Sequence, residues 1–210
     1  MRQIRSRPCD TPLGGELLGR LQKAWGNPFY AASVPYLRAI DLSARQCKGA
    51  ILECGTGVST LLLGLLGKEV WSLEHDAYWY RHMRALARKF GLSSARLVYA
   101  PLCDYGGFEW YKWDLHAKPQ FSLVVCDGPS GDICGGRYGL LPIMRAYLKP
   151  SAGILLDDAG RSSEAEVLRK WVNEFGVSHE LHGTGETTFA IITCSARRSF
   201  LAHTGAPSFA

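Results

Sequence analysis

The stretch Ile51-Leu52-Glu53-Cys54-Gly55-Thr56-Gly57-Val58-Ser59-Thr60-Leu61 determines how the chain is interpreted. It has the pattern of an apolar strand ending near a carboxylate, a Gly-x-Gly turn and the start of a helix. Gly55 and Gly57 permit positive φ and a close approach of the backbone, and N–H groups at a helix start are free to meet polar ligand atoms. This pattern is typical of a loop that binds a nucleotide-type cofactor.

Strand-like and helix-like segments alternate from residue 49 onward, which predicts an α/β domain with a mainly parallel sheet. The expected parallel strands are short and apolar, and they cover residues 50–53, 70–74, 96–100, 123–126 and 154–156. Residues 177–181 and 187–194 flank a short Gly-rich segment and indicate an antiparallel hairpin. A single domain is expected, with an N-terminal helical layer at 1–48, a cofactor-binding core at 49–194 and a tail at 195–210.

Acidic side chains stand where several of these strands end. Glu74 ends the second strand, 19 residues after the first glycine of the loop, where its carboxylate can accept hydrogen bonds from both hydroxyls of a ribose. Asp127 ends the fourth strand, and Asp157 and Asp158 end the fifth. Because the strand ends of an open parallel sheet face one crevice, these carboxylates are expected to converge with Glu53. Such a crevice suits a cofactor that carries positive charge.

The E-x-G-x-G loop at 53–57, Glu74, the Asp-Gly-Pro segment at 127–129 and the terminal hairpin together resemble a class I S-adenosylmethionine-dependent methyltransferase. Within that class the chain is most similar to small O-methyltransferases in which D-G-P is followed by R-Y, here at 137–138, and by D-D, here at 157–158. The Trp-Tyr pair at 110–111 also fits that group. The resemblance implies a Rossmann-like, seven-stranded sheet in the order 3-2-1-4-5-7-6, with the last strand antiparallel and helices on both faces.

The resemblance also implies which residues bind S-adenosylmethionine. Glu53 and the two glycines would border the methionine end of the cofactor, Glu74 would hold the ribose, and residues after the third strand would border adenine. The expected cofactor-binding residues are Glu53, Gly55, Gly57, Ser59, Glu74, His75, Leu102, Cys103 and Asp127. Asp127 is also the expected catalytic residue.

Asp127, Asp157 and Asp158 are in addition candidate ligands of a Mg²⁺ ion, because three carboxylates at adjacent strand ends supply the oxygen atoms that this ion prefers. Similar methyltransferases that use a metal hold it at these strand ends. The ion would bind an acceptor hydroxyl and lower its pKa. In the metal-free alternative, Asp127 contacts the ammonium group of the cofactor or acts as a base, and Asp157 or Asp158 caps the following loop or orients the acceptor.

Two further segments favour ordinary structural roles. Asn27-Pro28-Phe29-Tyr30 is similar to a loop with which amino-methyltransferases hold an amine, but it precedes the cofactor loop and is interpreted as a turn. The aromatic residues between 105 and 113 either cover the cofactor or substrate or pack on the sheet, and packing is favoured. The chain has seven cysteines and no C-x-x-C spacing, which indicates reduced thiols.

The composition, with 47% hydrophobic and 20% charged residues, predicts one soluble domain with a full core. The longest apolar run, 61–66, is far shorter than the about 20 residues of a membrane span. The basic N-terminus is not followed by an apolar stretch, so a cytoplasmic protein is expected rather than a secreted one. The net charge of +5 is small, which argues against a nucleic-acid partner. A small-molecule acceptor is what the resemblance to small O-methyltransferases implies.

The sequence thus predicts an S-adenosylmethionine-dependent O-methyltransferase that acts on a small molecule. A nitrogen or macromolecular acceptor stays open, because oxygen is favoured only by analogy. A nicotinamide-dependent oxidoreductase would also need ribose recognition at Glu74, but it is disfavoured by Glu53 and by Thr60, which stands where the third fingerprint glycine would fall. A cofactor-binding protein without catalytic activity is the remaining alternative.

Overall fold

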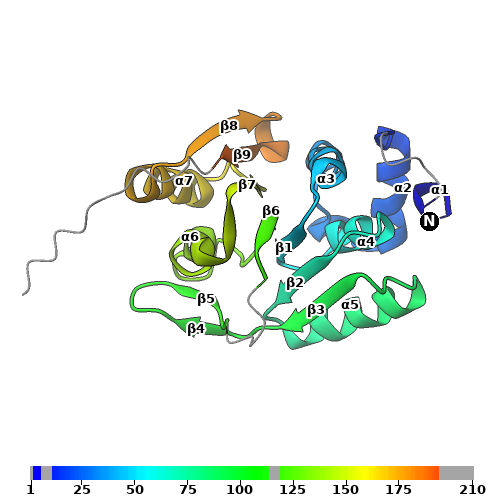
Figure 1. The fold of residues 1–210 in the computed structure, drawn as a ribbon, viewed down its shortest axis with the longest axis horizontal. Helices are drawn as coiled ribbons and strands as arrows, with labels where there is room; N and C mark the ends of the chain where they lie inside the picture. The colour runs from blue at the N-terminus through cyan, green and yellow to red at the C-terminus, as the bar shows by residue number, and fades with distance from the viewer. Residues whose placement is uncertain (1, 6–10, 114–118, 194–210) are drawn as a thin grey trace, which may run out of the picture.

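The computed structural model describes residues 2–5, 11–113 and 119–193, and a seven-stranded sheet forms its centre (Figure 1). The strands of this sheet are β1 (Ala50–Cys54), β2 (Val70–Glu74), β3 (Ala95–Tyr99), β6 (Phe121–Cys126), β7 (Leu148–Leu156), β8 (Ser178–His182) and β9 (Phe189–Thr193). Their order across the sheet is β3-β2-β1-β6-β7-β9-β8. The first five are mutually parallel, whereas β9 runs antiparallel to both β7 and β8.

This topology confirms the predicted fold class. Counted without the two strands of a separate small sheet, the order is 3-2-1-4-5-7-6, and the strand expected at 187–194 is the antiparallel β9. The last residue of that expected strand, Cys194, and the tail at 195–210 lie outside the described residues. An all-parallel sheet, which the oxidoreductase alternative would favour, is contradicted by the direction of β9.

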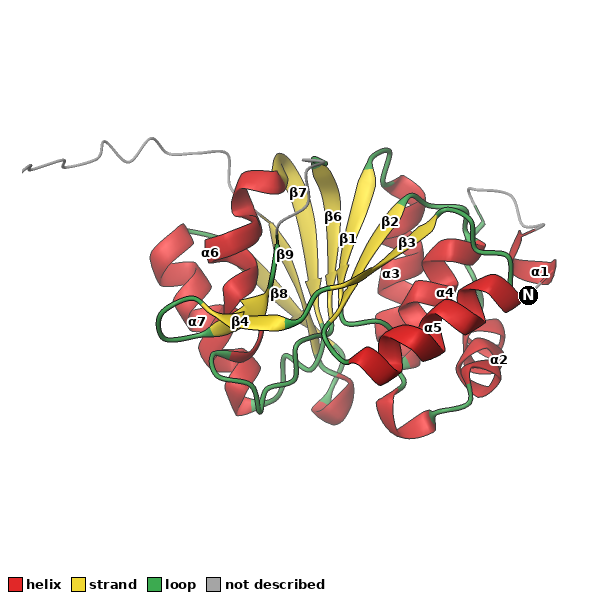
Figure 2. Cartoon of the chain, turned by 90° about the horizontal axis from the view of Figure 1, so that it is seen from below, coloured by secondary structure: helices red, strands yellow, loops and turns green. Residues whose placement is uncertain are grey.

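Two layers of helices enclose the sheet, and Figure 2 shows it fanning out between them. One layer holds α3 (Val34–Gln46), α4 (Val58–Leu65) and α5 (Ala77–Lys89), with α1 (Arg2–Arg5) and α2 (Gly15–Trp25) outside it; the other holds α6 (Leu140–Met144) and α7 (Ser162–Phe175). Short 3₁₀ helices are η1 (Pro28–Tyr30), η2 (Gly136–Gly139), η3 (Arg145–Tyr147) and η4 (Gly185–Thr187). None of the described helices combines the length and apolar character that a bilayer crossing requires.

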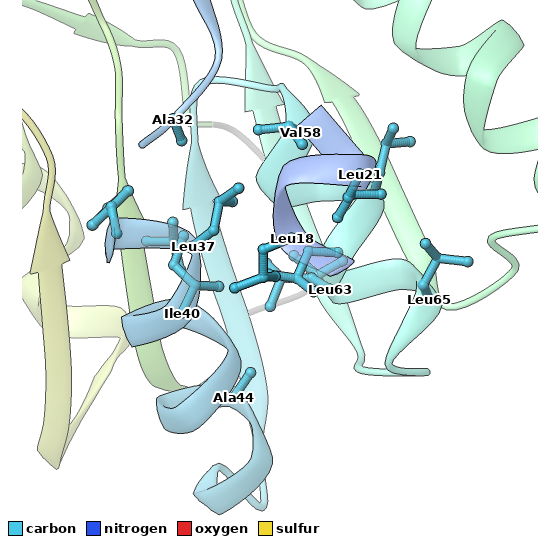
Figure 3. Close-up of a cluster of buried hydrophobic side chains, with 14 of the residues drawn as sticks. Leu18, Leu21, Ala32, Leu37, Ile40, Ala44, Val58, Leu63 and Leu65 are labelled. Atoms are coloured by element: carbon cyan, nitrogen blue, oxygen red, sulfur yellow. The ribbon is translucent and has the colours of Figure 1, made fainter. Parts of the chain in front are cut away.

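The predicted N-terminal helical layer packs through apolar side chains (Figure 3). In the amphipathic α2, Leu18 and Leu21 are buried, and in α3 Leu37 and Ile40 are fully buried. All eight residues of α4 are buried, as expected for a helix that is apolar all round and lies between the sheet and a second helical layer. Truncating one such leucine to alanine costs about 2–5 kcal/mol. This packing fixes the N-terminal layer against the helix that follows the glycine loop.

A small hairpin that the sequence did not predict lies on the other face of the sheet. Its strands are β4 (Leu102–Asp104) and β5 (Glu109–Tyr111), which pair antiparallel. Trp110 and Tyr111 are fully buried, and a Cβ added at Gly139 would lie 2.7 Å from the Trp110 side chain. The expected packing role is therefore confirmed for Trp110.

The described thiols are free, in agreement with the expectation of reduced cysteines. They belong to Cys47, Cys54, Cys103, Cys126 and Cys134. Cys54 and Cys126 are fully buried at the ends of β1 and β6, where they act as small apolar side chains.

Candidate functional site

A cavity of about 510 Å³ lies at the ends of the parallel strands, beneath part of the N-terminal layer. Its size falls in the usual range for small-molecule sites. The lining comes from four parts of the chain: Trp25, Phe29, Tyr30, Ala31 and Ala32; Gly55 and Thr56; Glu74, His75, Asp76, Trp79 and Tyr111; and Asp127, Gly128, Pro129, Ser130, Arg137, Asp157, Asp158 and Arg161. The structure thus brings together four of the five carboxylates that were predicted to converge, Glu74, Asp127, Asp157 and Asp158, whereas Glu53 is not in the lining.

Two glycines allow the loops after β1 and β6 to touch. Gly55 has a φ of +86°, and a Cβ added there would lie 3.1 Å from the Gly128 backbone nitrogen. A Cβ added at Gly128 would lie 2.6 Å from the Tyr111 hydroxyl and 3.0 Å from the Gly55 Cα. Gly57, by contrast, has an extended φ of −174° and does not use the positive φ that glycine permits. Gly57 is the N-cap of α4 and does not line the cavity.

Glu53 lies beneath the cavity and not in its wall. Its carboxylate is fully buried and accepts hydrogen bonds from the hydroxyls of Thr60, at 2.7 Å, and Ser72. Burial raises the pKa of Glu53 to about 7, although hydrogen bonds from Ser59, Ser72 and Thr60 oppose the shift. Ser59 is likewise buried outside the cavity lining. Both residues therefore support the loop from behind.

Glu74 presents a rigidly held carboxylate at the cavity edge. Its Oε2 accepts hydrogen bonds from the Thr56 backbone nitrogen at 3.1 Å and the Thr56 hydroxyl at 2.6 Å, and its Oε1 accepts one from the Asp76 backbone nitrogen at 2.9 Å. These bonds tie the end of β2 to the glycine loop and to the start of α5. Thr56 was missed by the sequence analysis, although its position inside the Gly-x-Gly turn could have pointed to it.

His75 and Tyr111 form the wall next to Glu74. Their rings meet edge to face, with centroids 5.9 Å apart, and both line the cavity. Leu102 and Cys103, which were expected to border adenine, are paired with Tyr111 and Trp110 in the hairpin and do not line the cavity. The hairpin thus brings a tyrosine to this wall in place of the two expected residues.

Arg137 stands among the carboxylates at the ends of β6 and β7. Its Nη2 donates to Asp127 Oδ1 at 3.1 Å and to Asp158 Oδ2 at 2.9 Å, and its Nη1 donates to the Asp157 carbonyl at 2.5 Å. Glu164 Oε1 lies 3.6 Å from Nη1. Asp158 also pairs with Arg161 at 3.0 Å. The sequence analysis noted Arg137 only as part of a motif and gave it no role.

The three aspartates differ in how far neighbouring positive charges compensate their carboxylates. Burial is the main cause that raises the pKa of Asp127 to about 6, with Arg137 opposing it. Burial, followed by Asp127 and Asp158, raises the pKa of Asp157 to about 8. The described contacts of the Asp157 carboxylate include one hydrogen bond, accepted from the Asp158 nitrogen at 3.0 Å, and no ion pair. Asp157 is therefore the least compensated of the three.

The Mg²⁺ site expected at Asp127, Asp157 and Asp158 is not supported. Within the described ranges, no group of three His, Cys, Asp or Glu side chains could hold a metal ion. The physical reason is that the Asp127 and Asp158 carboxylates turn toward the guanidinium of Arg137, which is 97% buried among them. These residues do not fit the ion, so the metal-free alternative is the better description of this cluster.

A second cavity, of about 470 Å³, adjoins the first. Phe29, Ala31, Asp157, Asp158 and Arg161 line both, and the rest of the second lining is Ser33, Gly160, Gly185 and Glu186. Most of this surface is polar. Asp157 and Asp158 therefore stand at the junction of the two cavities.

Aromatic side chains surround the mouth of the first cavity. The rings of Trp25 and Trp79 stack with centroids 6.1 Å apart, and Tyr30 meets Trp79 edge to face. Phe29 is 93% exposed. The segment interpreted as a turn is the 3₁₀ helix η1, and it reaches the site through Phe29 and Tyr30, a placement that the local motif did not reveal.

No family model and no curated protein sequence matches this chain. Solved structures do match. The O-methyltransferase from Bacillus cereus in complex with SAH has a TM-score of 0.61 at 16% identity, covering 86% of this chain and 90% of that one. The SAH-bound methyltransferase PaMTH1 from Podospora anserina has a TM-score of 0.61 at 15% identity, with coverages of 88% and 91%. The chain has the fold of class I methyltransferases.

The same methyltransferase fold occurs with other partners. The human hMettl16 catalytic domain in complex with a MAT2A 3′UTR hairpin has a TM-score of 0.56 at 13% identity, and the match covers 80% of this chain and 72% of that one. The methyltransferase fold alone therefore does not identify the acceptor.

Proposed function

We propose that this chain is an S-adenosylmethionine-dependent methyltransferase that transfers the methyl group to an oxygen atom of a small molecule. The observation that carries the proposal is the fixed carboxylate of Glu74, which lines a cavity next to the glycine loop in a methyltransferase fold. A carboxylate at the end of the second strand is suited to accept hydrogen bonds from a ribose. The oxygen acceptor rests on the likeness to the O-methyltransferase from Bacillus cereus.

The cavity lining fits this cofactor in two further respects. Among the described residues, the buried Trp25 Nε1 and Tyr111 hydroxyl line the cavity without a hydrogen-bond partner, so a ligand can satisfy them. Gly55 and Gly128 keep the floor between the two loops free of side chains. Glu74 and His75 would face the nucleoside, and Gly55, Thr56 and Asp127 the methionine part. The bound cofactor supplies a methyl group activated by the sulfonium.

The acceptor would enter from the second, polar cavity. Asp157 lies where the two cavities meet, and its carboxylate is not tied into an ion pair with the neighbouring arginines. With the cofactor bound, the ionised carboxylate of Asp157 would accept the hydroxyl proton of the acceptor while the methyl group is transferred to the acceptor oxygen. Because the pKa of Asp157 is raised to about 8, the ionised form increases as the pH rises toward 8. Asp127, expected from the sequence as the base, is held by Arg137 and would instead face the cofactor.

Calorimetry with S-adenosylhomocysteine tests the cofactor assignment. Wild-type protein is expected to bind it, and Glu74→Ala is expected to lose about 1.5–3 kcal/mol, because a hydrogen-bonded charged partner is removed. This loss corresponds to roughly 10- to 150-fold in affinity. Glu69→Ala is the matched control, since Glu69 is an exposed carboxylate immediately before the start of the same strand. Equal affinity in the wild type and Glu74→Ala would refute the assignment.

Two further measurements separate the alternatives. Formation of S-adenosylhomocysteine from S-adenosylmethionine, measured with panels of hydroxylated, amine and RNA acceptors, identifies the acceptor class. Turnover only with amines or RNA would contradict the oxygen and small-molecule parts of the proposal. Binding of NADH in place of S-adenosylhomocysteine would support an oxidoreductase, whereas binding without turnover on any panel would support a protein without catalytic activity.

A further inference from the structure

Two glycines in the left-handed conformation bring Arg137 to the ends of the strands. Gly135 and Gly136 have φ values of +78° and +50°, and this pair of left-handed residues turns the chain into η2 immediately before Arg137. The Trp171 Nε1 donates to the Tyr138 carbonyl at 2.9 Å and so ties η2 to α7. The arginine side chain is therefore anchored from behind by the fold.

The guanidinium is surrounded by oxygen atoms from three different parts of the chain. Nη2 has three within 3.2 Å: the Asp127 carbonyl, Asp127 Oδ1 and Asp158 Oδ2. Nη1 contacts the Asp157 carbonyl and lies 3.6 Å from the Glu164 carboxylate, which is itself 99% buried. Three carboxylates and two carbonyls supply oxygen atoms of the kind that divalent cations prefer, but they are divided between the two terminal nitrogens of the guanidinium. Here that set surrounds a monovalent cation that belongs to the chain.

The conformation of Asp158 agrees with this arrangement. It is the one non-glycine residue with positive φ within the described part of the chain, at 55°. Aspartate enters this region more readily than most residues, but the conformation still needs support from its surroundings. The support comes from Arg137 and Arg161, which both form ion pairs with Asp158 Oδ2. The carboxylate is thereby turned inward to the two guanidinium groups.

We infer that the guanidinium of Arg137 takes the place of a divalent cation at the ends of β6 and β7, fixing Asp127 and Asp158 so that this chain needs no metal ion there. Arg137 is a positioning residue, because it acts through the carboxylates that it holds. Asp157, which Arg137 contacts only through the backbone carbonyl, keeps its carboxylate available at the junction of the two cavities. The inference rests on the proposed function only where turnover is measured.

Binding of Mn²⁺, followed by the electron paramagnetic resonance signal of the free ion, tests the inference without any need for activity. The wild type is expected to leave the signal of added Mn²⁺ unchanged. Arg137→Met removes the positive charge and is expected to bind one Mn²⁺ per chain, which should also raise its melting temperature. The double variant Arg137→Met with Asp158→Asn is expected to lose that binding.

Two outcomes would overturn the inference. One is stoichiometric binding of Mn²⁺ to the wild type that Asp158→Asn abolishes. The other is a folded Arg137→Met variant that gains no Mn²⁺ binding, since the surrounding oxygens would then not form a cation site. Arg137→Lys, which keeps a positive charge, is expected to bind no Mn²⁺ and to retain more S-adenosylhomocysteine formation than Arg137→Met. If Arg137→Met does not fold, the wild-type titration still tests whether the native chain binds Mn²⁺ at this cluster.

Turnover measurements test the inference independently of the Mn²⁺ titrations. If the proposed function holds, wild-type turnover is expected to be unchanged after removal of divalent cations with EDTA. Loss of turnover that is restored by Mg²⁺ would overturn the inference while leaving the proposed function intact. If no acceptor panel gives turnover, the proposed function fails, and the Mn²⁺ titrations still decide the role of Arg137.

Discussion

The contact between Gly55 and Gly128 leads to a quantitative prediction about the glycine loop. Gly55→Ala places a side chain at a φ of +86°, which costs about 1–2 kcal/mol. Its Cβ would also lie 3.1 Å from the Gly128 nitrogen and 3.2 Å from the Asp127 carbonyl, and neither backbone atom can rotate away. Overpacking of this kind adds about 1–3 kcal/mol. The expected total is about 2–5 kcal/mol.

Gly67→Ala is the matched control for this substitution. Gly67 has a similar φ of +70°, but an added Cβ would have no atom within 4 Å. Only the backbone cost of about 1–2 kcal/mol applies. Gly67 follows the last turn of α4, at the end of the helix remote from the glycine loop.

Thermal unfolding and calorimetry with S-adenosylhomocysteine measure both effects. For a chain of this size each kcal/mol lowers the melting temperature by about 2–4 °C, so Gly55→Ala is expected to melt about 4–20 °C below the wild type and Gly67→Ala about 2–8 °C below it. Only Gly55→Ala is expected to weaken ligand binding. Equal melting temperatures and equal affinities in the two variants would refute the argument that the two loops need bare backbone where they meet.

Three further predictions concern the site. Folding raises the pKa of Asp157 from 3.8 to about 8, so between these pH values the folded chain retains a proton that the unfolded chain releases. The contribution of this group to the free energy of unfolding therefore falls as the pH rises from 4 to 8, by up to about 1.4 kcal/mol per pH unit. Asp157→Asn should make the free energy of unfolding less dependent on pH over that range than it is in the wild type. Parallel curves of free energy against pH for the two proteins would contradict this. Thr56→Val removes the 2.6 Å bond to Glu74 and should destabilise the chain by about 1–2 kcal/mol in urea unfolding, unlike Thr56→Ser. Tyr111→Phe removes a buried hydroxyl without a partner and should leave the free protein as stable or stabilise it, while calorimetry should detect weaker ligand binding.

The sheet could be predicted because each buried strand is a short apolar run between clear boundaries. The antiparallel β9 was also foreseeable, since a Gly-rich segment joins it to β8. The hairpin at 102–111 was not, because its strands are three residues each and show no periodicity of their own. For the same reason the assignment of Leu102 and Cys103 to the cavity wall could not be made from their position after the third strand.

The acidic residues of the site could be predicted from the sequence, but the groups that their side chains contact could not. Glu74 and Asp127 stand at strand ends, and the topology alone brings such ends together. The expected Mg²⁺ failed because a pattern of carboxylates shows available ligands without showing which cation they surround. Arg137 comes from a short 3₁₀ helix, and its insertion between Asp127 and Asp158 depends on tertiary packing. The position of Phe29 at the cavity is likewise set by the docking of α2 and α3.

The walls of the cavity are produced at very different times during translation. Of the cavity lining, the aromatic wall from Trp25 to Tyr30 is synthesised first and the loop that carries Arg161 is synthesised last. Tyr36, just after that aromatic wall, donates to the Leu155 carbonyl at 3.0 Å across 119 positions of sequence. Contacts of such separation form late. The nascent chain therefore carries the early part of the lining without this later partner until the strand that contains Leu155 has been made, so the part of the cavity made first is completed only when the last part is made.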